Sequence, residues 1–361
     1  MMKSTKEENI ALIRQLSEAK APSGFEDEAI AVGREFAQSF ADVEEDCLRN
    51  LYVTRRENQG NKPVFMLDAH GDEVGMMIHS IKPNGTLRFV TLGRFTPGTL
   101  PGSKVWVRNA QGEFIPGVVA AKPPHFMSAD EKNRLADVSD LVIDIGATSA
   151  QEAQEEFGIR IGEPAVSAVE FSCDEKRDLL MGKGFDCRIG CAAMLETMKR
   201  LTEEELDFDV VGVMSSQEEV GDRGVKVAVE HVKPQVAICF EGCPADDTFT
   251  EPYAIQTALK KGPMIRFMDV SMIANPRYMR DTIDLAERLG IPLQASVRTG
   301  GGNNGAVINL AGQGVPVIVV GIPVRYIHSH YGISSYQDFQ AAVDLAVAVV
   351  KEMTLEKAAS L

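Results

Sequence analysis

Several histidines and carboxylates in this chain follow short apolar runs, where a folded sheet would gather them. The first motif, Asp-Ala-His-Gly-Asp-Glu at residues 68–73, comes directly after the apolar run 64–67. In open α/β sheets, functional sites form at the carboxyl ends of strands. His70 could bind a metal ion through one ring nitrogen while the Asp72 carboxylate orients the other nitrogen. Taken alone, this motif is more typical of a solvated loop.

Two adjacent glutamates, Glu218 and Glu219, follow the apolar run 210–214. Such neighbours usually face water. In a hydrolytic metal site they can divide the work, because one carboxylate binds the metal and the other takes a proton from an activated water. A glycosidase would instead use the pair as acid and nucleophile. Adjacent residues on an extended segment point to opposite faces, so they are poorly placed to flank one glycosidic bond.

Two further apolar runs are followed by candidate metal ligands. Glu241 directly follows the run 236–240, and His328 and His330 come shortly after the run 315–320. Each could be an ordinary loop residue. Four separate strand ends that each carry a histidine or a carboxylate form a pattern that chance produces less easily. Oxygen and nitrogen ligands without thiolate suit Zn, Co or Mn, and carboxylate-bridged pairs of such ions are common in hydrolases.

Asp186 stands at the start of a helical pattern in which Met194, Met198 and Leu201 share one face. An aspartate at this place is most often the N-cap of the helix. It could equally bridge two metal ions. The spacing leaves both interpretations open.

The four apolar runs also indicate the fold. They are short, rich in Val and Ile and without alternation, which is typical of a parallel sheet that is covered on both faces. Helical patterns at residues 278–289 and 335–353 alternate with them. We therefore predict an α/β fold with a mostly parallel sheet flanked by helices.

Residues 76–167 have a different pattern. Strand-like pieces at 87–92, 105–107 and 114–120 are separated by turn signals, and a helical pattern occurs only around 151–157. We predict a small β-rich domain that is inserted into an α/β domain formed by residues 1–75 and 168–361.

The composition argues against several kinds of binding partner and bears on the cellular location. The 361 residues carry a formal net charge of −15, which argues against nucleic acid and anionic membranes as partners. No apolar run approaches the ~20 residues of a membrane span, and the first residues do not form a secretory signal. The six cysteines contain no C-x-x-C pair, and we expect them to be reduced. We therefore expect residence in the cytoplasm.

Taken together, the motifs resemble those of the glutamyl and deblocking aminopeptidases, which include proteins labelled cellulase M. These are dinuclear-metal peptidases whose subunits form tetrahedral particles. The resemblance covers nearly the whole chain, and its motifs occur in the order and spacing of that family. They lie at residues 23–26, 70–75, 186–188, 217–221 and 325–329.

The resemblance implies a role for each matching residue. Asp186 would bridge two divalent ions, most simply Zn with Co or Mn as alternatives. Glu218 would be the general base, and Asp72 would support His70. The implied metal ligands are His70, Asp186, Glu219, Glu241 and His328. The implied fold is a catalytic α/β domain with an inserted β-rich domain that mediates dimer contacts, and the implied assembly is a homo-oligomer, a dodecamer built from dimers.

The chain departs from that family's pattern at three places. Glu241 stands where the family usually has Asp, so ligation there needs a longer side chain. Cys187 follows the bridging aspartate where Asp or Asn is usual. Residues 303–305 read Asn-Asn-Gly in place of Thr-Asp-Ala, so that an amide replaces a carboxylate. The first departure keeps the carboxylate chemistry, which favours an active enzyme.

We predict an aminopeptidase that removes N-terminal residues from peptide substrates with a metal-activated water. A related amidohydrolase that deacylates small N-acyl substrates is one alternative. A protein that has kept the fold and the assembly but lost activity is another.

Overall fold

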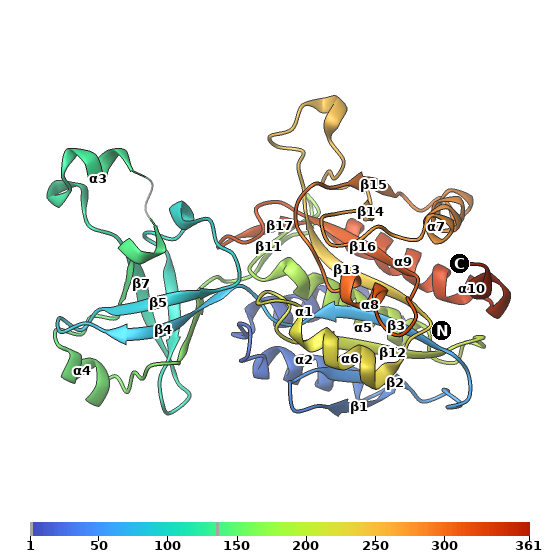
Figure 1. Cartoon of the computed structure of the whole chain (residues 1–361), viewed down its shortest axis with the longest axis horizontal. Helices are drawn as coiled ribbons and strands as arrows, with labels where there is room; N and C mark the ends of the chain where they lie inside the picture. The colour runs from blue at the N-terminus through green and yellow to red at the C-terminus, as the bar shows by residue number, and fades with distance from the viewer. Residues whose placement is uncertain (1–2, 135–136) are drawn as a thin grey trace.

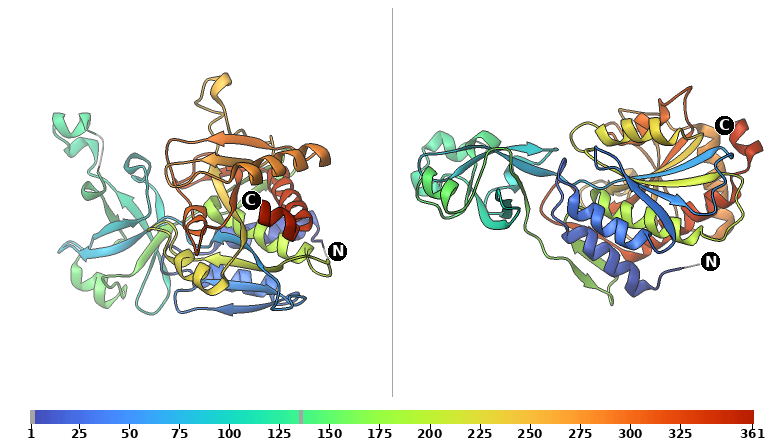
Figure 2. Two further views of the ribbon diagram at one scale, coloured as in Figure 1. Left: turned by 45° about the vertical axis from the view of Figure 1, so that its right-hand side comes forward. Right: turned by 90° about the horizontal axis from the view of Figure 1, so that it is seen from below.

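The computed structural model describes residues 3–134 and 137–361, which form an α/β body and a smaller β-barrel that projects from one end of it (Figures 1 and 2). Within these residues the body contains an eight-stranded sheet of order β1-β2-β12-β3-β13-β16-β14-β15. Its central strands β12, β3, β13 and β16 are parallel, and antiparallel pairs join them to β2 on one side and β14 on the other. The bounds are β1 Ala41–Glu45, β2 Leu51–Arg55, β3 Val64–His70, β12 Asp209–Ser215, β13 Val236–Pro244, β14 Met264–Met268, β15 Gln294–Val297 and β16 Val317–Val324. The predicted α/β fold with a mostly parallel sheet is confirmed.

The central strands are longer than the apolar runs that predicted them. Their side chains are buried on both faces of the sheet, as the continuous Val and Ile content requires. The prediction that Glu241 directly follows its strand was wrong. β13 continues to Pro244, because Gly242 and Cys243 stay in register with Ile322 and Pro323 of β16. Glu241 therefore projects from within the sheet, where the strand fixes its backbone.

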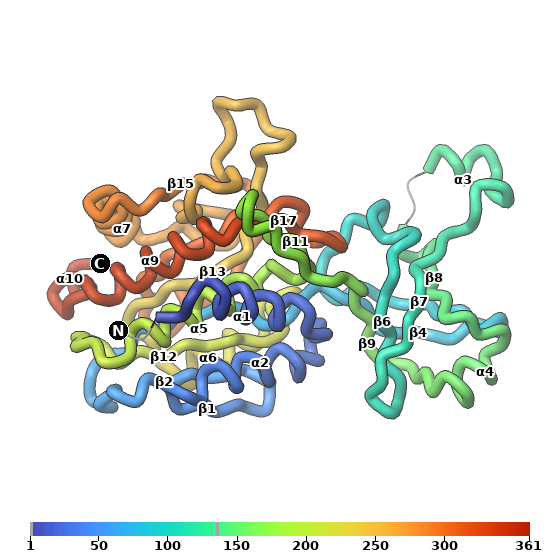
Figure 3. Tube along the Cα trace, turned by 180° about the vertical axis from the view of Figure 1, so that it is seen from behind, coloured from blue at the N-terminus to red at the C-terminus, as the bar shows by residue number. Residues whose placement is uncertain are grey.

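Helix α5 lies at the centre of one face of the sheet, with α1, α2 and α9 around it (Figure 3). Almost all of its side chains are buried, because α1 and α9 cover its outer side. Helices α6 and α8 cover the other face (Figure 1). The bounds are α1 Lys6–Glu18, α2 Asp27–Ala37, α5 Phe185–Arg200, α6 Arg223–Val232, α7 Pro276–Leu289, α8 Gly305–Asn309, α9 Tyr336–Glu352 and α10 Leu355–Ser360. No helix of the described residues is long and apolar enough to cross a membrane.

The projecting barrel is closed by six strands in the order β4-β5-β8-β7-β6-β9. It has its own apolar core. The prediction of one helical segment in this region was wrong, because α3 is present as well as α4. The five residues of α3 have no apolar stripe from which a helix could be predicted. The bounds are β4 Gly75–Ile81, β5 Leu87–Leu92, β6 Lys104–Arg108, β7 Phe114–Ala120, α3 Ala129–Asn133, β8 Val142–Asp144, α4 Ala150–Glu155 and β9 Pro164–Ser167.

A small antiparallel sheet links the barrel's exit to the body. It has the order β10-β11-β17 and joins segments that are far apart in the chain. Its strands are β10 Ser172–Asp174, β11 Leu179–Gly182 and β17 Gly332–Ser334. β11 leads directly into the start of α5, and β17 follows the loop that carries His328.

A buried ionic cluster joins three segments at the start of α5. Arg188 is among the largest fully buried side chains. Its guanidinium lies 3.1 Å from Oε1 of Glu73, which also accepts a hydrogen bond from Lys183. The guanidinium donates four further hydrogen bonds, to the carbonyl oxygens of Leu16, Ala19, Ala21 and Gly71. The cluster thus fixes the α1–α2 connection and the loop after β3 against α5.

Replacing Glu73 by Gln should destabilise the fold strongly, because two buried cations would lose their one carboxylate partner. Breaking a buried ion pair on one side typically costs about 3–5 kcal/mol. Denaturant unfolding at matched protein concentration would measure the loss. The control is Glu352→Gln at the exposed Arg288–Glu352 pair, which should leave the unfolding midpoint nearly unchanged. Equal midpoints for the two variants would contradict this role of Glu73.

Candidate metal centre

The candidate ligands lie together at the carboxyl ends of the parallel strands, although they come from distant parts of the chain. His70 is the last residue of β3, and Glu241 lies in β13. Glu218 and Glu219 belong to the loop between β12 and α6, and His328 to the loop after β16. Asp186 is brought to them by the first turn of α5. The sheet places the strand ends side by side, and α5 completes the group.

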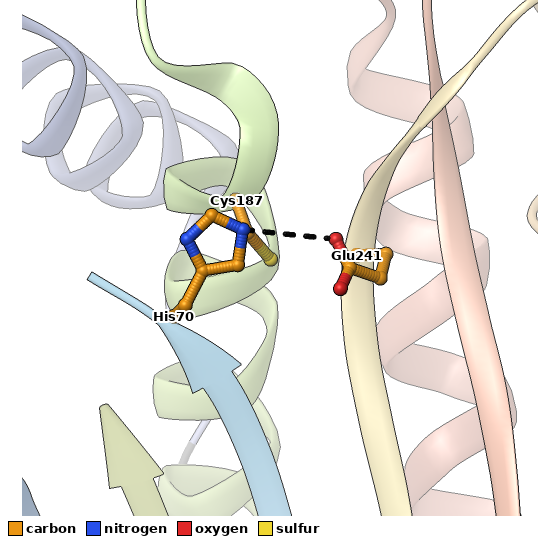
Figure 4. A group of neighbouring side chains, drawn as sticks. All are labelled: His70, Cys187 and Glu241. Atoms are coloured by element: carbon orange, nitrogen blue, oxygen red, sulfur yellow. Dashed lines mark ion pairs between the residues drawn. The ribbon is translucent and has the colours of Figure 1, made fainter. Parts of the chain in front are cut away.

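The first group surrounds the His70 imidazole. Its Nε2 lies 3.4 Å from Oδ1 of Asp186 and 3.8 Å from Oε2 of Glu241, and the latter pair is drawn in Figure 4. The same Nε2 is 3.8 Å from Oε2 of Glu218. Three carboxylates therefore face one ring nitrogen, which is the nitrogen available to a metal ion.

The second group surrounds His328. Its Nε2 lies 3.1 Å from Oδ2 of Asp186 and 3.4 Å from Oε1 of Glu219. Asp186 thus turns one carboxylate oxygen toward His70 and the other toward His328. The residue does not cap its helix, because Gly184 is the N-cap; the peptide bond after Asp186 is cis. The N-cap interpretation was therefore wrong, and the two Asp186 oxygens each face a different histidine.

Asp72 holds the loop that carries the two glutamates. Its carboxylate accepts hydrogen bonds from the backbone N–H groups of Glu218 at 3.0 Å and Glu219 at 3.2 Å, and from the Ser23 hydroxyl at 2.6 Å. Nδ1 of His70 lies 3.4 Å from Oδ1 of Asp72 and 3.2 Å from the Asp72 carbonyl oxygen. This residue therefore orients His70 and the glutamate loop together.

The pKa values of these groups are shifted because several carboxylates are buried close to one another. Burial raises the pKa of Glu219 and of Glu241 well above the usual range, and the Asp186 carboxylate adds to both shifts. Burial also raises the pKa of Glu218 to about 8. For His70, burial opposes protonation, but Glu218, Asp186 and Asp72 outweigh it and raise the imidazole pKa. Bound cations would relieve this repulsion.

Two oxygens in the cluster have no hydrogen bond from any described residue. They are Oε1 of Glu219, which has only the ion-pair contact to His328, and Oε1 of Glu241. Buried carboxylate oxygens are costly unless hydrogen bonds or cations satisfy them. Oxygen and imidazole donors around a bridging carboxylate suit two divalent ions of the Zn, Co or Mn kind. The residues present therefore fit a dinuclear centre.

Other predicted residues lie elsewhere, and some contacts were not predicted. His330 belongs to none of the ligand groups found among the described residues.

Glu26 is fully buried and accepts a hydrogen bond from the backbone N–H of Gln217 at 3.1 Å. Gln217 has a φ of 53°, an uncommon conformation for a residue with a side chain. In the sequence, only the motif at residues 23–26 pointed to this support for the glutamate loop. It did not show which residue Glu26 would contact.

A cleft of about 640 Å³ opens beside the cluster. Glu218, Glu241 and His328 line it on the side of the candidate ligands, and Arg94 and Arg298 line it elsewhere. A cleft of this size accommodates a small ligand or the end of a peptide. The ligand groups are therefore accessible to a substrate.

Imidazoles and carboxylates gathered at the carboxyl ends of parallel strands, beside an open cleft, are typical of metal-dependent α/β hydrolases. The chain belongs to the M42 glutamyl aminopeptidase family, whose model matches residues 50–345. The Lactococcus lactis subsp. cremoris protein called glutamyl aminopeptidase is 32% identical over 356 residues, which span 97% of this chain and 98% of that protein.

Solved structures agree with this membership. The TET aminopeptidase of the marine sediment archaeon Thaumarchaeota archaeon SCGC AB-539-E09 has a TM-score of 0.94 at 36% identity, with 99% of each chain covered. The Pyrococcus horikoshii TET1 peptidase, described as assembling into a tetrahedron or a large octahedral shell, has a TM-score of 0.85 at 30% identity. That match covers 96% of this chain and 100% of the other. The resemblance inferred from the motifs is confirmed, and so is the peptidase class.

Shortening Glu241 to Asp should weaken one metal site and leave the other intact. Glu241 faces His70 and not His328, so a retracted carboxylate would affect only the ion on the His70 side. We expect a loss of at least about tenfold in affinity for that ion, since changing even an outer partner of a ligand has such effects. Calorimetric metal titration would resolve the two sites, with exposed Glu230→Asp on α6 as control. Unchanged binding at both sites would remove Glu241 from the ligands.

Proposed function

We propose that the protein is a dinuclear metal-dependent aminopeptidase in which His70, Asp186, Glu219, Glu241 and His328 hold two ions. The observation that carries the proposal is the position of Asp186, whose two oxygens face different histidines. Such a carboxylate is the usual bridge in two-metal hydrolytic sites. We favour Zn, with Co or Mn as alternatives, because the ligands are carboxylates and imidazoles.

Two bound divalent ions would supply Lewis-acid polarisation of the peptide carbonyl and would acidify a water molecule. The general base would be Glu218, which lies beside both the cleft and His70. Its raised pKa suits a group that takes up a proton and then delivers it to the leaving amine. Asp72 would position it by holding the N–H groups of Glu218 and Glu219. The free α-amine of a peptide would contact an ion or a carboxylate in the cleft.

The rival functions differ in substrate and in metal dependence. A deacylase would hydrolyse N-acetyl amino acids, whereas the proposed enzyme should hydrolyse aminoacyl-nitroanilides and lose that activity to a chelator. The expectation that Glu218 and Glu219 point apart was wrong, because their carboxylates and the His70 imidazole offer ligand atoms within 4.8 Å of one another. A glycosidase is disfavoured because the chain belongs to the M42 glutamyl aminopeptidase family. A non-catalytic assembly protein would bind no metal. Metal content by mass spectrometry, measured with these assays, distinguishes the four cases.

Glu218→Gln should keep both metal ions and lose most turnover. The amide preserves the shape of the side chain but cannot take a proton. The loss of turnover should be on the order of the 10²–10⁴-fold that general-base removal typically causes. Glu219→Gln should instead lose affinity for one ion, and excess metal should partly restore its activity. Metal content and turnover are to be measured together on both variants.

The contrast between the two glutamates serves as its own control. If Glu218→Gln lost metal while Glu219→Gln retained it, the two assignments would be reversed. If neither variant changed metal content or turnover, both side chains would be ordinary loop carboxylates.

We also propose a dodecamer built from dimers, in which the barrel of residues 76–167 mediates the dimer contact. A dimer along each edge of a tetrahedron makes a dodecamer, and the P. horikoshii relative is described as forming a tetrahedron. Closed symmetric assemblies are the common outcome for homo-oligomers. Large apolar side chains are exposed on the barrel at Phe126 and Ile161, and at Tyr253 on the protruding connection between β13 and β14 (Figure 1).

Light scattering coupled to size exclusion should give the mass of twelve chains at micromolar concentration. Ile161→Asp in the barrel should shift the assembly to smaller species, because a charge would be buried at the proposed dimer contact. Val227→Asp, at an exposed apolar position on α6, is the matched control and should leave the mass unchanged. A wild-type monomer would defeat the proposed assembly.

For the location we propose the cytoplasm. All six cysteines lie within the described ranges and none of them forms a disulfide, which suits a reducing compartment.

A further inference from the structure

Cys187 lies inside the candidate metal centre, although cysteine is not among the ligands that the resemblance implied. Ligand-capable atoms of His70, Cys187 and Glu241 all lie within 4.8 Å of one another, and the three residues are buried. Figure 4 shows the Cys187 sulfur beside the His70 ring, with the Glu241 carboxylate facing both from β13. This group is on the His70 side of Asp186.

Close packing of α5 on β13 holds the thiol in this position. Sγ of Cys187 donates a hydrogen bond to the carbonyl oxygen of Phe240 at 3.1 Å, next to Glu241 in the strand. Two glycines permit the approach. A Cβ on Gly190 would lie 2.4 Å from the Cys187 sulfur, and a Cβ on Gly242 would lie 2.2 Å from the carbonyl oxygen of Phe185. The sulfur is therefore fixed beside Glu241.

Glu241 provides a second, independent sign of a ligand at this place. Its side chain is only 7% exposed, and its Oε1 has no hydrogen-bond partner in the described chain. Its carboxylate points toward His70 and Cys187 (Figure 4). A bound cation would satisfy a buried carboxylate oxygen of this kind. The thiol and the unsatisfied carboxylate border the same small space.

We propose that Cys187 is a metal ligand, contributing its thiolate to the ion held by His70 and Glu241. This inference rests on the proposed function. On binding, the thiol releases its proton to solvent, its hydrogen bond to Phe240 breaks, and a sulfur–metal bond forms without any change of oxidation state. A mixed thiolate, imidazole and carboxylate set prefers a thiophilic divalent cation, so this position should select Zn²⁺ over Mn²⁺.

X-ray absorption of the zinc-loaded full-length protein tests the sulfur–metal bond directly. We expect a sulfur scatterer at about 2.3 Å, distinct from nitrogen and oxygen ligands at about 2.0–2.2 Å. Cys187→Ser should lose most of that signal. Cys191→Ser is the matched control, since Cys191 is buried one turn further along α5 and donates to the carbonyl oxygen of His70. That variant should keep the sulfur signal.

Metal selectivity provides a second readout that does not depend on activity. Cys187→Ser should bind Zn²⁺ at least about tenfold more weakly at one of two sites, while Mn²⁺ affinity changes little. If the serine variant does not fold, Cys187→Asn replaces it, since the family pattern has Asn or Asp at this position.

The outcomes separate this inference from the proposed function. A wild-type protein that binds two zinc ions without sulfur scattering overturns the role of Cys187 and leaves the aminopeptidase intact. Retention of the full sulfur signal in Cys187→Asn also overturns it. A protein that binds no metal, with peptidase activity insensitive to chelators, overturns both.

Discussion

The Arg188 guanidinium holds together the three segments from which the candidate centre is built. The connection between α1 and α2 carries Ser23 and Glu26, the loop after β3 carries Asp72, and the first turn of α5 carries Asp186. Arg188 donates to carbonyl oxygens in the first two segments and belongs to the third. The Ala19 carbonyl also accepts from Lys183, and the Ala21 carbonyl from the Glu73 N–H. Arg188 and Lys183 together therefore fix the relative positions of groups that are far apart in the chain.

The scaffold also has to hold carboxylates together against their mutual repulsion. It does so by giving backbone N–H groups to the carboxylates that are not candidate ligands. Asp72 receives the N–H groups of Glu218 and Glu219, and Glu26 receives those of Gln217 and Gly24. These bonds maintain the left-handed backbone at Gln217, which costs free energy on its own. The candidate ligands Glu219 and Glu241 keep oxygens unsatisfied. Binding of cations would recover part of that cost, so metal binding and stability should be coupled.

Much of the fold and of the candidate centre follows from local patterns. Apolar runs predicted the four central strands, and the strand ends predicted that His70 and His328 would lie at one edge of the sheet, where each faces Asp186. Other features depend on long-range packing. Arg188 would ordinarily be interpreted as a surface residue, because a buried guanidinium needs acceptors, which here come from two distant segments. The extent of β13 depends on its pairing with β16, and the choice between a cap and a bridge for Asp186 depends on where the histidines lie. These three features cannot be derived from the spacing of residues in the sequence.

The three departures from the family pattern have different physical consequences. Cys187 and Glu241 both lie on the His70 side of the centre, whereas the group of Asp186, Glu219 and His328 keeps the family's residue types. The differences are thus concentrated at one of the two proposed ion positions.

Asn304 lies in a different environment. Its amide donates to Oδ2 of Asp68 at 2.8 Å and to the Ser215 hydroxyl at 2.7 Å, and burial raises the pKa of Asp68 to about 6. An aspartate at position 304 would set a second carboxylate against the buried Asp68, and the pair would have to share a proton. The Asn304 amide instead supplies a hydrogen-bond donor that does not titrate. Asp68 stands two residues before His70 in β3, so the amide secures the strand end that carries this candidate ligand.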